Sequence, residues 1–487
     1  MRPGGKWGGV RRGLVLNLIS NVMFFVSGYV LHYFLGNSMP PAAYGVVGTI
    51  ITVLDFEYMF VSNGARQSLA SQISRHKYDI GDVIGKTLLF QLLVIAVFFS
   101  VNFFGAPLFG IVLNDESLDF YFRVAAFLVI ANGLQVILLG INDGLQRFGT
   151  SALLSTFYPI AKLGVIPLII FVFADDPVLG VEIGFLLAVA LTILLGCVIL
   201  AVNYAPLKVH RPQKVPFGEV AHHTLSFSFF FIMVSLVLSV DTLIVKAVVE
   251  PAAMAGYYTG AMNFGKIAYY LLQAFSTVIL PVVAKLVAEG SLDRALERIR
   301  ELLLLVFVFI LPIPVVISAS SGSLLLAFYS EGFTVAAPTL SCLALSNFFM
   351  GMTVILNMVL NSYGSSRFSD ALSIVSLVVV VPVFILSAKF GGIVAIAVAS
   401  VTCTFITMLV SFVRAYRKVG AVITRTAWLV LGSNIALWLA VWFGFRFFST
   451  SNLLVLGLVY AVVYVGYIGV LMAAKVVSIS SLKKLGA

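Results

Sequence analysis

Two stretches of the chain, one in each half, read alike: PPAAYGVVGTI at residues 40–50 and PAAMAGYYTGAM at residues 251–262. Each of them leads into a long apolar run that closes with a basic segment. Runs of about twenty apolar residues have the length that an α-helix needs to cross a hydrocarbon core. The two stretches therefore predict an all-α, polytopic membrane protein that contains two copies of one helical unit.

The composition excludes a soluble fold. Of the 487 residues, 61% are hydrophobic and only 10% are charged, which supplies far less polar surface than a soluble chain needs. The first apolar segment, from Gly13 to Leu35, is too long for the hydrophobic region of a signal peptide, and no small-residue cleavage site follows it. We expect it to be retained as the first span.

Hydropathy and loop signals predict about fourteen spans. They cover residues 13–35, 42–63, 83–112, 118–142, 150–173, 178–204, 221–248, 252–284, 299–320, 333–361, 368–388, 391–413, 424–447 and 452–474. The corresponding division is an N-terminal lobe at 1–204, a cytoplasmic linker at 205–220, a C-terminal lobe at 221–418, and two extra spans with a tail at 419–487.

The basic residues give the orientation. With the N-terminus inside, 24 of the 30 Lys and Arg residues fall in cytoplasmic segments, and only Lys246, Lys389 and Arg446 fall outside. This bias is typical of the positive-inside rule, and it predicts a protein of the inner or plasma membrane with both termini in the cytoplasm. The net charge of +10 then reflects topology and anionic lipid rather than nucleic acid.

The repeat extends beyond the opening pair of stretches. GLQRFGTSALLS at 144–155 is echoed by GSSRFSDALSI at 364–374, which places Arg147 and Arg367 in the same inner loop of the two lobes. Because each lobe contains an even number of spans, both lobes have the same orientation, related by an axis along the membrane normal. Coincidence between apolar, low-complexity segments is the alternative.

This plan of six, six and two spans resembles the multidrug/oligosaccharidyl-lipid/polysaccharide exporter superfamily over essentially the whole chain. The likeness is greatest to its polysaccharide flippase branch, the O-antigen and exopolysaccharide translocases. It is carried by PAAYG at 41–45 and by DTLIVKAVVEPAAMAGYYTGAMNF at 241–264, with Asp241, Gly256, Tyr257 and Ala261 at the family's positions.

The resemblance implies a transport mechanism. It implies two six-helix lobes that face each other in a V around a cavity that opens alternately to each side of the membrane. It also implies a polyprenyl-pyrophosphate-linked glycan as cargo, with membrane lipid and other polysaccharide assembly proteins as further partners. The expected cofactor is none, apart from a coupling ion, H⁺ or Na⁺.

Four ionisable residues lie near the middle of predicted spans, where each costs about 2.5–3.5 kcal/mol. They are Asp55 and Glu57 in span 2, Lys162 in span 5 and Lys266 in span 8. Lysine binds phosphate as a compact point charge, so the two lysines predict a cationic site for a pyrophosphate. A structural pair of Lys266 with one of the carboxylates is the alternative.

The two carboxylates point in different directions, because residues two apart are separated by about 200° on a helix. Only one of them can face a cavity, and we favour Asp55. Either carboxylate is a candidate for ion coupling or charge pairing. Arg123 and Asp241 lie nearer the outer surface, where cargo contact competes with snorkelling or a local ion pair.

No sequence motif for catalysis is present. The chain has no Walker loop, no nucleophile–base set and no metal-ligand cluster, and its three cysteines lie apart in apolar runs. A transporter is therefore favoured over a membrane glycan ligase or polymerase. A cation-coupled multidrug exporter of the same superfamily stays open. A major-facilitator exporter is disfavoured, because GARQSLASQISRHKYDIGD at 64–82 lacks its Gly-rich, Asp-Arg loop pattern.

Overall fold

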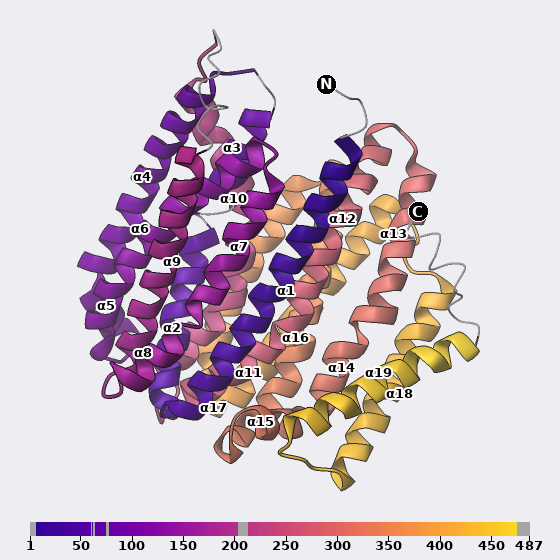
Figure 1. Ribbon diagram of the computed structural model, residues 1–487. Coiled ribbons are helices and arrows are strands. Elements are labelled where there is room, and N and C mark those ends of the chain that lie inside the picture. Colours follow the sequence, from indigo (N-terminus) through magenta and orange to yellow (C-terminus); the bar gives the residue numbers. More distant parts are fainter. Residues whose placement is uncertain (1–5, 60, 62–63, 75–76, 203–212, 475–487) are drawn as a thin grey trace. The chain divides into compact units, whose positions relative to one another are not determined.

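The computed structural model describes residues 6–59, 61, 64–74, 77–202 and 213–474 (Figure 1). Every regular element within these ranges is a helix. Part of the predicted linker and the C-terminal tail lie outside the described residues. The same holds for seven of the basic residues that indicated the orientation, namely Arg2, Arg75, Lys208, Arg211, Lys475, Lys483 and Lys484.

Nine helical segments in the described ranges are long and apolar enough to cross a membrane. They are Ile80–Phe104, Ser117–Gly144, Phe148–Phe171, Pro177–Val202, Leu292–Ala319, Glu331–Ser362, Arg367–Val419, Arg425–Phe447 and Leu453–Ala473. The prediction of an all-α, polytopic membrane protein is confirmed. The number of fourteen spans stays a prediction.

One of these segments contains two predicted spans. Within α17 (Ser366–Val419) the backbone leaves the helical conformation at Gly391 and Gly392. Gly392 has φ +59° and ψ −149°, a conformation that is open essentially to glycine alone. This is the turn expected between predicted spans 11 and 12.

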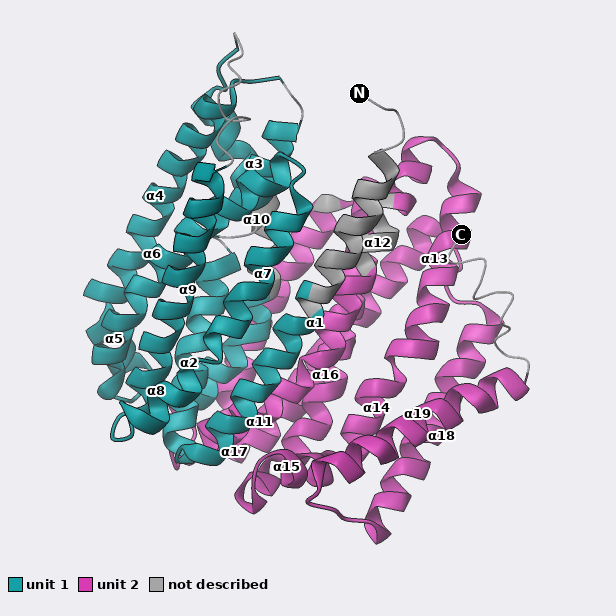
Figure 2. Ribbon diagram, in the orientation of Figure 1, with its two compact units in different colours: residues 1–247 teal, residues 248–487 magenta. Residues whose placement is uncertain are grey.

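The chain divides into two compact units, residues 1–247 and 248–487 (Figure 2). The division falls at the end of α10 (Phe217–Val248), which is predicted span 7, so this helix packs with unit 1. One of its contacts there is the hydrogen bond that the Tyr78 hydroxyl donates to Glu219 at 2.7 Å. The division drawn from the repeat places the same span in the second lobe, and that assignment stays a proposal.

Unit 1 is built around α6 (Ser117–Gly144), which is predicted span 4. The helices in contact with α6 are α2 (Pro41–Tyr58), α3 (Gly64–Ser74), α4 (Ile80–Phe104), α5 (Ala106–Val112), α7 (Phe148–Lys162) and α9 (Pro177–Val202). α1 (Lys6–Ser38) packs on α7, and α8 (Val165–Phe171) packs on α9.

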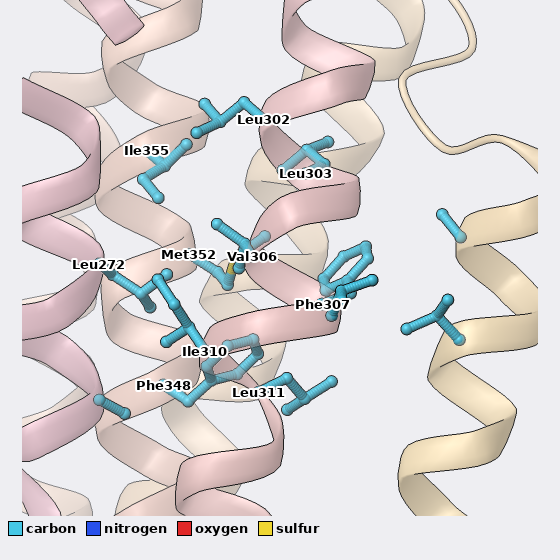
Figure 3. Packing of buried hydrophobic residues seen from close by; sticks show 14 of the residues in the cluster. Leu272, Leu302, Leu303, Val306, Phe307, Ile310, Leu311, Phe348, Met352 and Ile355 are labelled. Carbon is cyan, nitrogen blue, oxygen red and sulfur yellow. The ribbon is translucent and has the colours of Figure 1, made fainter. Parts of the chain in front are cut away.

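Unit 2 is built around α16 (Ala337–Ser362), which is predicted span 10. The helices in contact with α16 are α11 (Ala253–Gly265), α12 (Ile267–Ala288), α14 (Pro312–Ala319), α15 (Ser321–Phe328) and α17. Its largest described apolar cluster joins Leu272, Leu302, Val306, Met352 and Ile355 (Figure 3). Spans 4 and 10 are equivalent in the predicted repeat, and each is the central helix of its unit.

The turns after these central helices share one geometry. In unit 1 the N–H of Arg147 donates to the carbonyl of Asn142 at 2.8 Å, and in unit 2 the N–H of Ser365 donates to Leu360 at 2.9 Å. The preceding residues, Gln146 and Gly364, both have positive φ, as in a Schellman cap. The repeated arginine follows the turn directly in unit 1 but two residues later in unit 2, so the sequence alignment was two residues out of register here.

Two segments expected to be loops contain short helices. α3 occupies part of the predicted inner loop 64–82, and α15, followed by a 3₁₀ turn at Glu331–Ala336, occupies the predicted outer connection 321–332. Both helices are too short to give a clear hydropathy signal. Their buried faces are defined by packing against helices that are distant in the sequence.

The ninth predicted span contains a π-helical segment. It runs as α13 (Leu292–Leu305), a π-helix at Val306–Ile310 and then α14. In the π register the carbonyls of Phe307 and Phe309 would pair with residues 312 and 314, but both of these are prolines, which have no N–H. These two carbonyls therefore need donors from elsewhere.

The two C-terminal helices supply those donors. Asn434 of α18 (Arg425–Phe447) donates to the carbonyl of Phe307 at 3.1 Å, and the Tyr464 hydroxyl of α19 (Leu453–Ala473) donates to that of Phe309 at 2.9 Å. Because a bilayer offers no water to freed carbonyls, we infer that the extra helices stabilise unit 2 at this segment.

We predict that Tyr464→Phe lowers the thermal stability of the purified protein, because the carbonyl of Phe309 loses its donor. The expected cost is about 1 kcal/mol. Asn434→Ala should cost more, since Asn434 also contacts the Tyr467 hydroxyl at 2.8 Å. The measurement is thermal unfolding in detergent, followed by circular dichroism.

The matched control is Tyr416→Phe, which makes the same chemical change at an exposed tyrosine of α17. Stabilities of the Tyr464 and Asn434 variants equal to that of the control would contradict the role given to these hydrogen bonds.

Candidate functional site

Lys162 lies at a break in the fifth predicted span. α7 ends at this lysine and α8 begins at Val165. Pro159 within α7 lacks an N–H, and the two N–H groups after Lys162 bond only three residues back, at 3.0 and 2.9 Å. The half-buried lysine thus ends a half-helix, where the helix dipole favours a positive charge.

α9 packs closely against this break. A Cβ atom on Gly184 would lie 2.4 Å from Cγ2 and 3.1 Å from Cα of Val165, so a larger residue would displace α8. One residue further on, the Phe185 ring meets the lysine, with the Lys162 Nζ 3.9 Å from the ring centroid. A cation–π contact of this kind contributes about 0.5–2 kcal/mol.

The charge of Lys162 is not neutralised by a close partner. Asp55, on α2, lies near enough for an electrostatic interaction with its ammonium. Among the described residues, however, no carboxylate oxygen comes within the 4.0 Å of a salt bridge to its Nζ. The lysine therefore keeps an ammonium group that can attract an anion.

Asp55 and Glu57 point to different surroundings. Glu57 is 3% exposed and accepts a hydrogen bond from Asn102 of α4 at 2.5 Å, whereas Asp55 is exposed. This is the geometry expected of two residues separated by about 200° on one helix. Glu57 belongs to the interior of unit 1, and the role of either carboxylate in coupling stays a proposal.

Lys266 lies at a local distortion in the eighth predicted span, where the Lys266 N–H still donates to the Met262 carbonyl at 3.0 Å and the Tyr270 N–H to the Lys266 carbonyl at 3.1 Å. It is the one residue between α11 and α12, with φ −71° and ψ −10°. The preceding Gly265 approaches α16 so closely that a Cβ on it would lie 3.1 Å from Cβ of Leu343. Within the described part of unit 2, no carboxylate lies at salt-bridge distance from the Lys266 Nζ. Each unit thus places one lysine where the helix of a predicted span departs from regular geometry.

The two outer candidates have local partners. Arg123 donates to Asp119 one turn before it, at 2.9 and 3.2 Å, and both side chains are exposed. Such a pair contributes little to stability. Asp241 is 3% exposed on α10 and accepts the backbone N–H of Thr242 at 2.7 Å. Their contact with cargo stays a prediction.

An ion pair between Lys246 and Asp115 was not predicted from the sequence. The two atoms, Nζ and Oδ2, are 2.5 Å apart, and the lysine side chain is 3% exposed. The pair joins the end of α10 to the connection between α5 and α6. Both residues counted as outer charges, but no signal joins residues that are 131 positions apart.

The environment of Asp115 shifts its acidity. Burial by itself would raise the pKa of this carboxyl, but hydrogen bonds from Lys246 and Ser117 outweigh burial and hold the pKa below its ordinary value. The ionised carboxylate is therefore the form that stabilises the fold.

Sequence analysis also missed Glu182, on α9. It is the one charged residue of predicted span 6, so a search for ionisable residues within spans would have found it. Glu182 is one of the residues around a small apolar pocket that Phe185, the residue that contacts Lys162, also lines.

Interrupted membrane helices that carry charged residues define a class of protein. In transporters, substrates and coupling ions bind where spanning helices are discontinuous. The described residues contain no group of three or more His, Cys, Asp or Glu side chains arranged to hold a metal ion. The fold and the two lysine sites together are those of a membrane transporter.

Comparison with known families agrees with this class. Residues 10–287 match the polysaccharide biosynthesis protein family, and the chain belongs to that family. Residues 226–386 also match the MatE family. No curated protein matches the sequence.

Solved structures show the same fold. The lipid II flippase MurJ, in an inward closed conformation, is similar with a TM-score of 0.72 and 12% identity, over 95% of this chain and 100% of that one. An inward-facing multidrug resistance MATE transporter has a TM-score of 0.65 and 13% identity, over 82% and 95%. A transporter from Pyrococcus furiosus, described as having a binding pocket of reverse polarity, has a TM-score of 0.57 and 15% identity, over 84% and 93%. The chain is therefore a flippase or transporter of the multidrug/oligosaccharidyl-lipid/polysaccharide superfamily.

We predict that Asp115→Asn lowers the free energy of unfolding by about 2 kcal/mol at neutral pH, because a buried ammonium loses its charged acceptor. The folded-state pKa lies below the unfolded-state value near 3.9. The contribution is therefore present above about pH 4 and is lost as the pH falls through the folded-state pKa.

The measurement is denaturant unfolding of the purified protein between neutral and acidic pH, with Glu116→Gln as a control at the neighbouring exposed acid. A wild-type advantage over Asp115→Asn that is absent at neutral pH, or that survives unchanged in acid, would be evidence against this pair.

Proposed function

We propose that this chain flips a polyprenyl-pyrophosphate-linked oligosaccharide from the cytoplasmic to the outer leaflet for polysaccharide export. In this proposal both termini are cytoplasmic, and the chain has no enzymatic activity of its own. One observation carries the proposal. Lys162 sits at a break in the fifth predicted span and Lys266 at a local distortion in the eighth, and neither has a carboxylate at salt-bridge distance among the described residues of its own unit.

The free energy of burial gives these lysines a reason to bind anions. A charge within the membrane costs about 2.5–3.5 kcal/mol on insertion scales, and the usual compensation is a carboxylate partner. A pyrophosphate group offers more negative charge than one carboxylate, and an ammonium can bind it without fixed bidentate geometry. An anionic lipid-linked cargo would therefore stabilise the two ammonium groups, which have no carboxylate partner in the fold itself.

The names of similar proteins support two cargo classes. The family concerns polysaccharide biosynthesis, and MurJ is a lipid II flippase, which favours a lipid-linked glycan. The MatE match over residues 226–386 favours a multidrug exporter as the second candidate. Cationic drugs would be repelled by the two lysines, so we prefer the anionic cargo. The fold excludes the major-facilitator alternative.

We predict that Lys162→Ala and Lys266→Ala each abolish glycan export while the protein is still made and inserted. Losing one charge-assisted contact costs about 1.5–3 kcal/mol, which corresponds to at least about tenfold in affinity. Surface polysaccharide and the trapped lipid-linked precursor would be measured in cells, with the amount of membrane protein determined by immunoblot.

The control is Lys389→Ala, which removes the same charge from an exposed position on α17. Lys162→Arg and Lys266→Arg test whether charge alone suffices. Normal export by both alanine variants would refute the cationic site. Loss of drug resistance in the variants, with polysaccharide export intact, would instead favour the multidrug exporter.

A further inference from the structure

Glu182 is a buried carboxyl that the proposed cargo site does not use. It is 3% exposed, and neither of its carboxyl oxygens has a hydrogen-bond partner among the described residues. Nearly all buried polar groups in folded proteins are hydrogen-bonded, and an ionised carboxylate without partners is very costly in an apolar environment. The side chain is therefore compensated by something other than these neighbours.

The pocket beside Glu182 limits which ligand can compensate the buried carboxyl. It is lined by apolar side chains of α2 and α6, among them Ile50, Leu54 and Leu128, and by Phe185 from α9. Glu182 is the one residue of this lining whose side chain contains oxygen. Hard metal cations require several oxygen ligands, which the lining does not offer. A proton needs only one carboxyl oxygen.

The surrounding charges favour the protonated form. Asp176, just before α9, and Tyr121, on α6, both interact electrostatically with Glu182, and a second negative charge beside Asp176 is unfavourable. The helix dipole acts mainly within the first turn of a helix. Because Glu182 is the sixth residue of α9, the dipole does little to stabilise an ionised carboxylate there.

The remaining helices packed on α9 bring few other titratable groups. On α2 and α7 these groups are Tyr44, Asp55, Glu57, Tyr58, Tyr158 and Lys162, and α8 has none. Glu57 is engaged by Asn102. The Lys162 ammonium contacts the face of the Phe185 ring, and the same ring lines the pocket. The lysine's positive charge therefore does not pair directly with the Glu182 carboxylate.

We propose that Glu182 is a proton-binding site of unit 1. With the pocket as described, the residue is a neutral carboxylic acid, and the proton passes to water when the pocket opens to solvent. No other atom is exchanged. As a second step, which rests on the proposed function, this proton exchange couples cargo movement to a pH gradient through the contact of Phe185 with Lys162.

The binding step is tested without cargo, by infrared spectroscopy of the purified full-length protein in lipid at neutral pH. We expect Glu182→Gln to remove a C=O band of a protonated carboxylic acid, and Glu182→Asp to shift that band. The control Glu331→Gln, at an exposed acid, should remove only ionised carboxylate absorption. If Glu182→Gln also removes only ionised carboxylate absorption, the proton site is refuted.

The coupling step is tested in proteoliposomes that contain a fluorescent polyprenyl-pyrophosphate sugar. Wild-type flipping should respond to an imposed pH gradient, and Glu182→Gln should flip at the rate seen without a gradient. A variant that still responds to the gradient as wild type does refutes coupling through Glu182. If the wild-type protein does not flip this probe at all, the proposed function fails while the infrared result still decides the proton site.

Discussion

A chain within hydrocarbon must satisfy its own backbone hydrogen bonds, and each interruption of a spanning helix in this protein has to meet that constraint. At the π-helical segment Val306–Ile310 the constraint is met from outside, because Asn434 and Tyr464 donate to the freed carbonyls. At the break beside Lys162 a cation stands at the end of α7 instead, whereas the α-helical hydrogen bonds continue across Lys266. The first solution fixes the backbone, and the second leaves a charge that a ligand can use.

Basic and acidic side chains within the predicted spans of this protein differ in how deeply they are buried. Lys162 and Lys266 are only half-buried, whereas Glu57 and Glu182 are almost completely enclosed. A carboxyl can be enclosed because it becomes neutral by binding a proton, and Glu57 also has the amide of Asn102. A lysine that serves an anion has to keep its charge, so it needs access to water or cargo. The difference in burial is the one that the proposed roles require.

Much of the fold could be predicted because hydropathy and charge bias act over whole spans. The helical class and the superfamily were recovered from the sequence, and so was an interruption between spans 11 and 12, although it was expected at residues 389–390 and lies at Gly391–Gly392. Interruptions within spans were not, because they depend on one or two residues, such as Gly184 facing Val165 or the lone residue Lys266 between two helices. Lys162 and Lys266 were found because a charge in an apolar run is visible. The pair of Asp115 with Lys246 was not, because it depends on packing between distant segments.

Phe185 explains how one helix can serve a cation and a proton without neutralising both. A direct pair of Lys162 with the Glu182 carboxylate would satisfy both charges and leave neither for a ligand. The ring instead presents its negative π face to the ammonium at 3.9 Å, while Glu182 lies one helical turn earlier in the apolar pocket that the ring also lines. The lysine is held by a cation–π contact and not by a carboxylate, so in the proposed function it stays available to an anionic cargo, and the proposed ligand of the carboxyl is a proton. Because the Phe185 ring separates Lys162 from Glu182, the lysine can still bind an anion and the carboxyl can still bind a proton in the proposed mechanism.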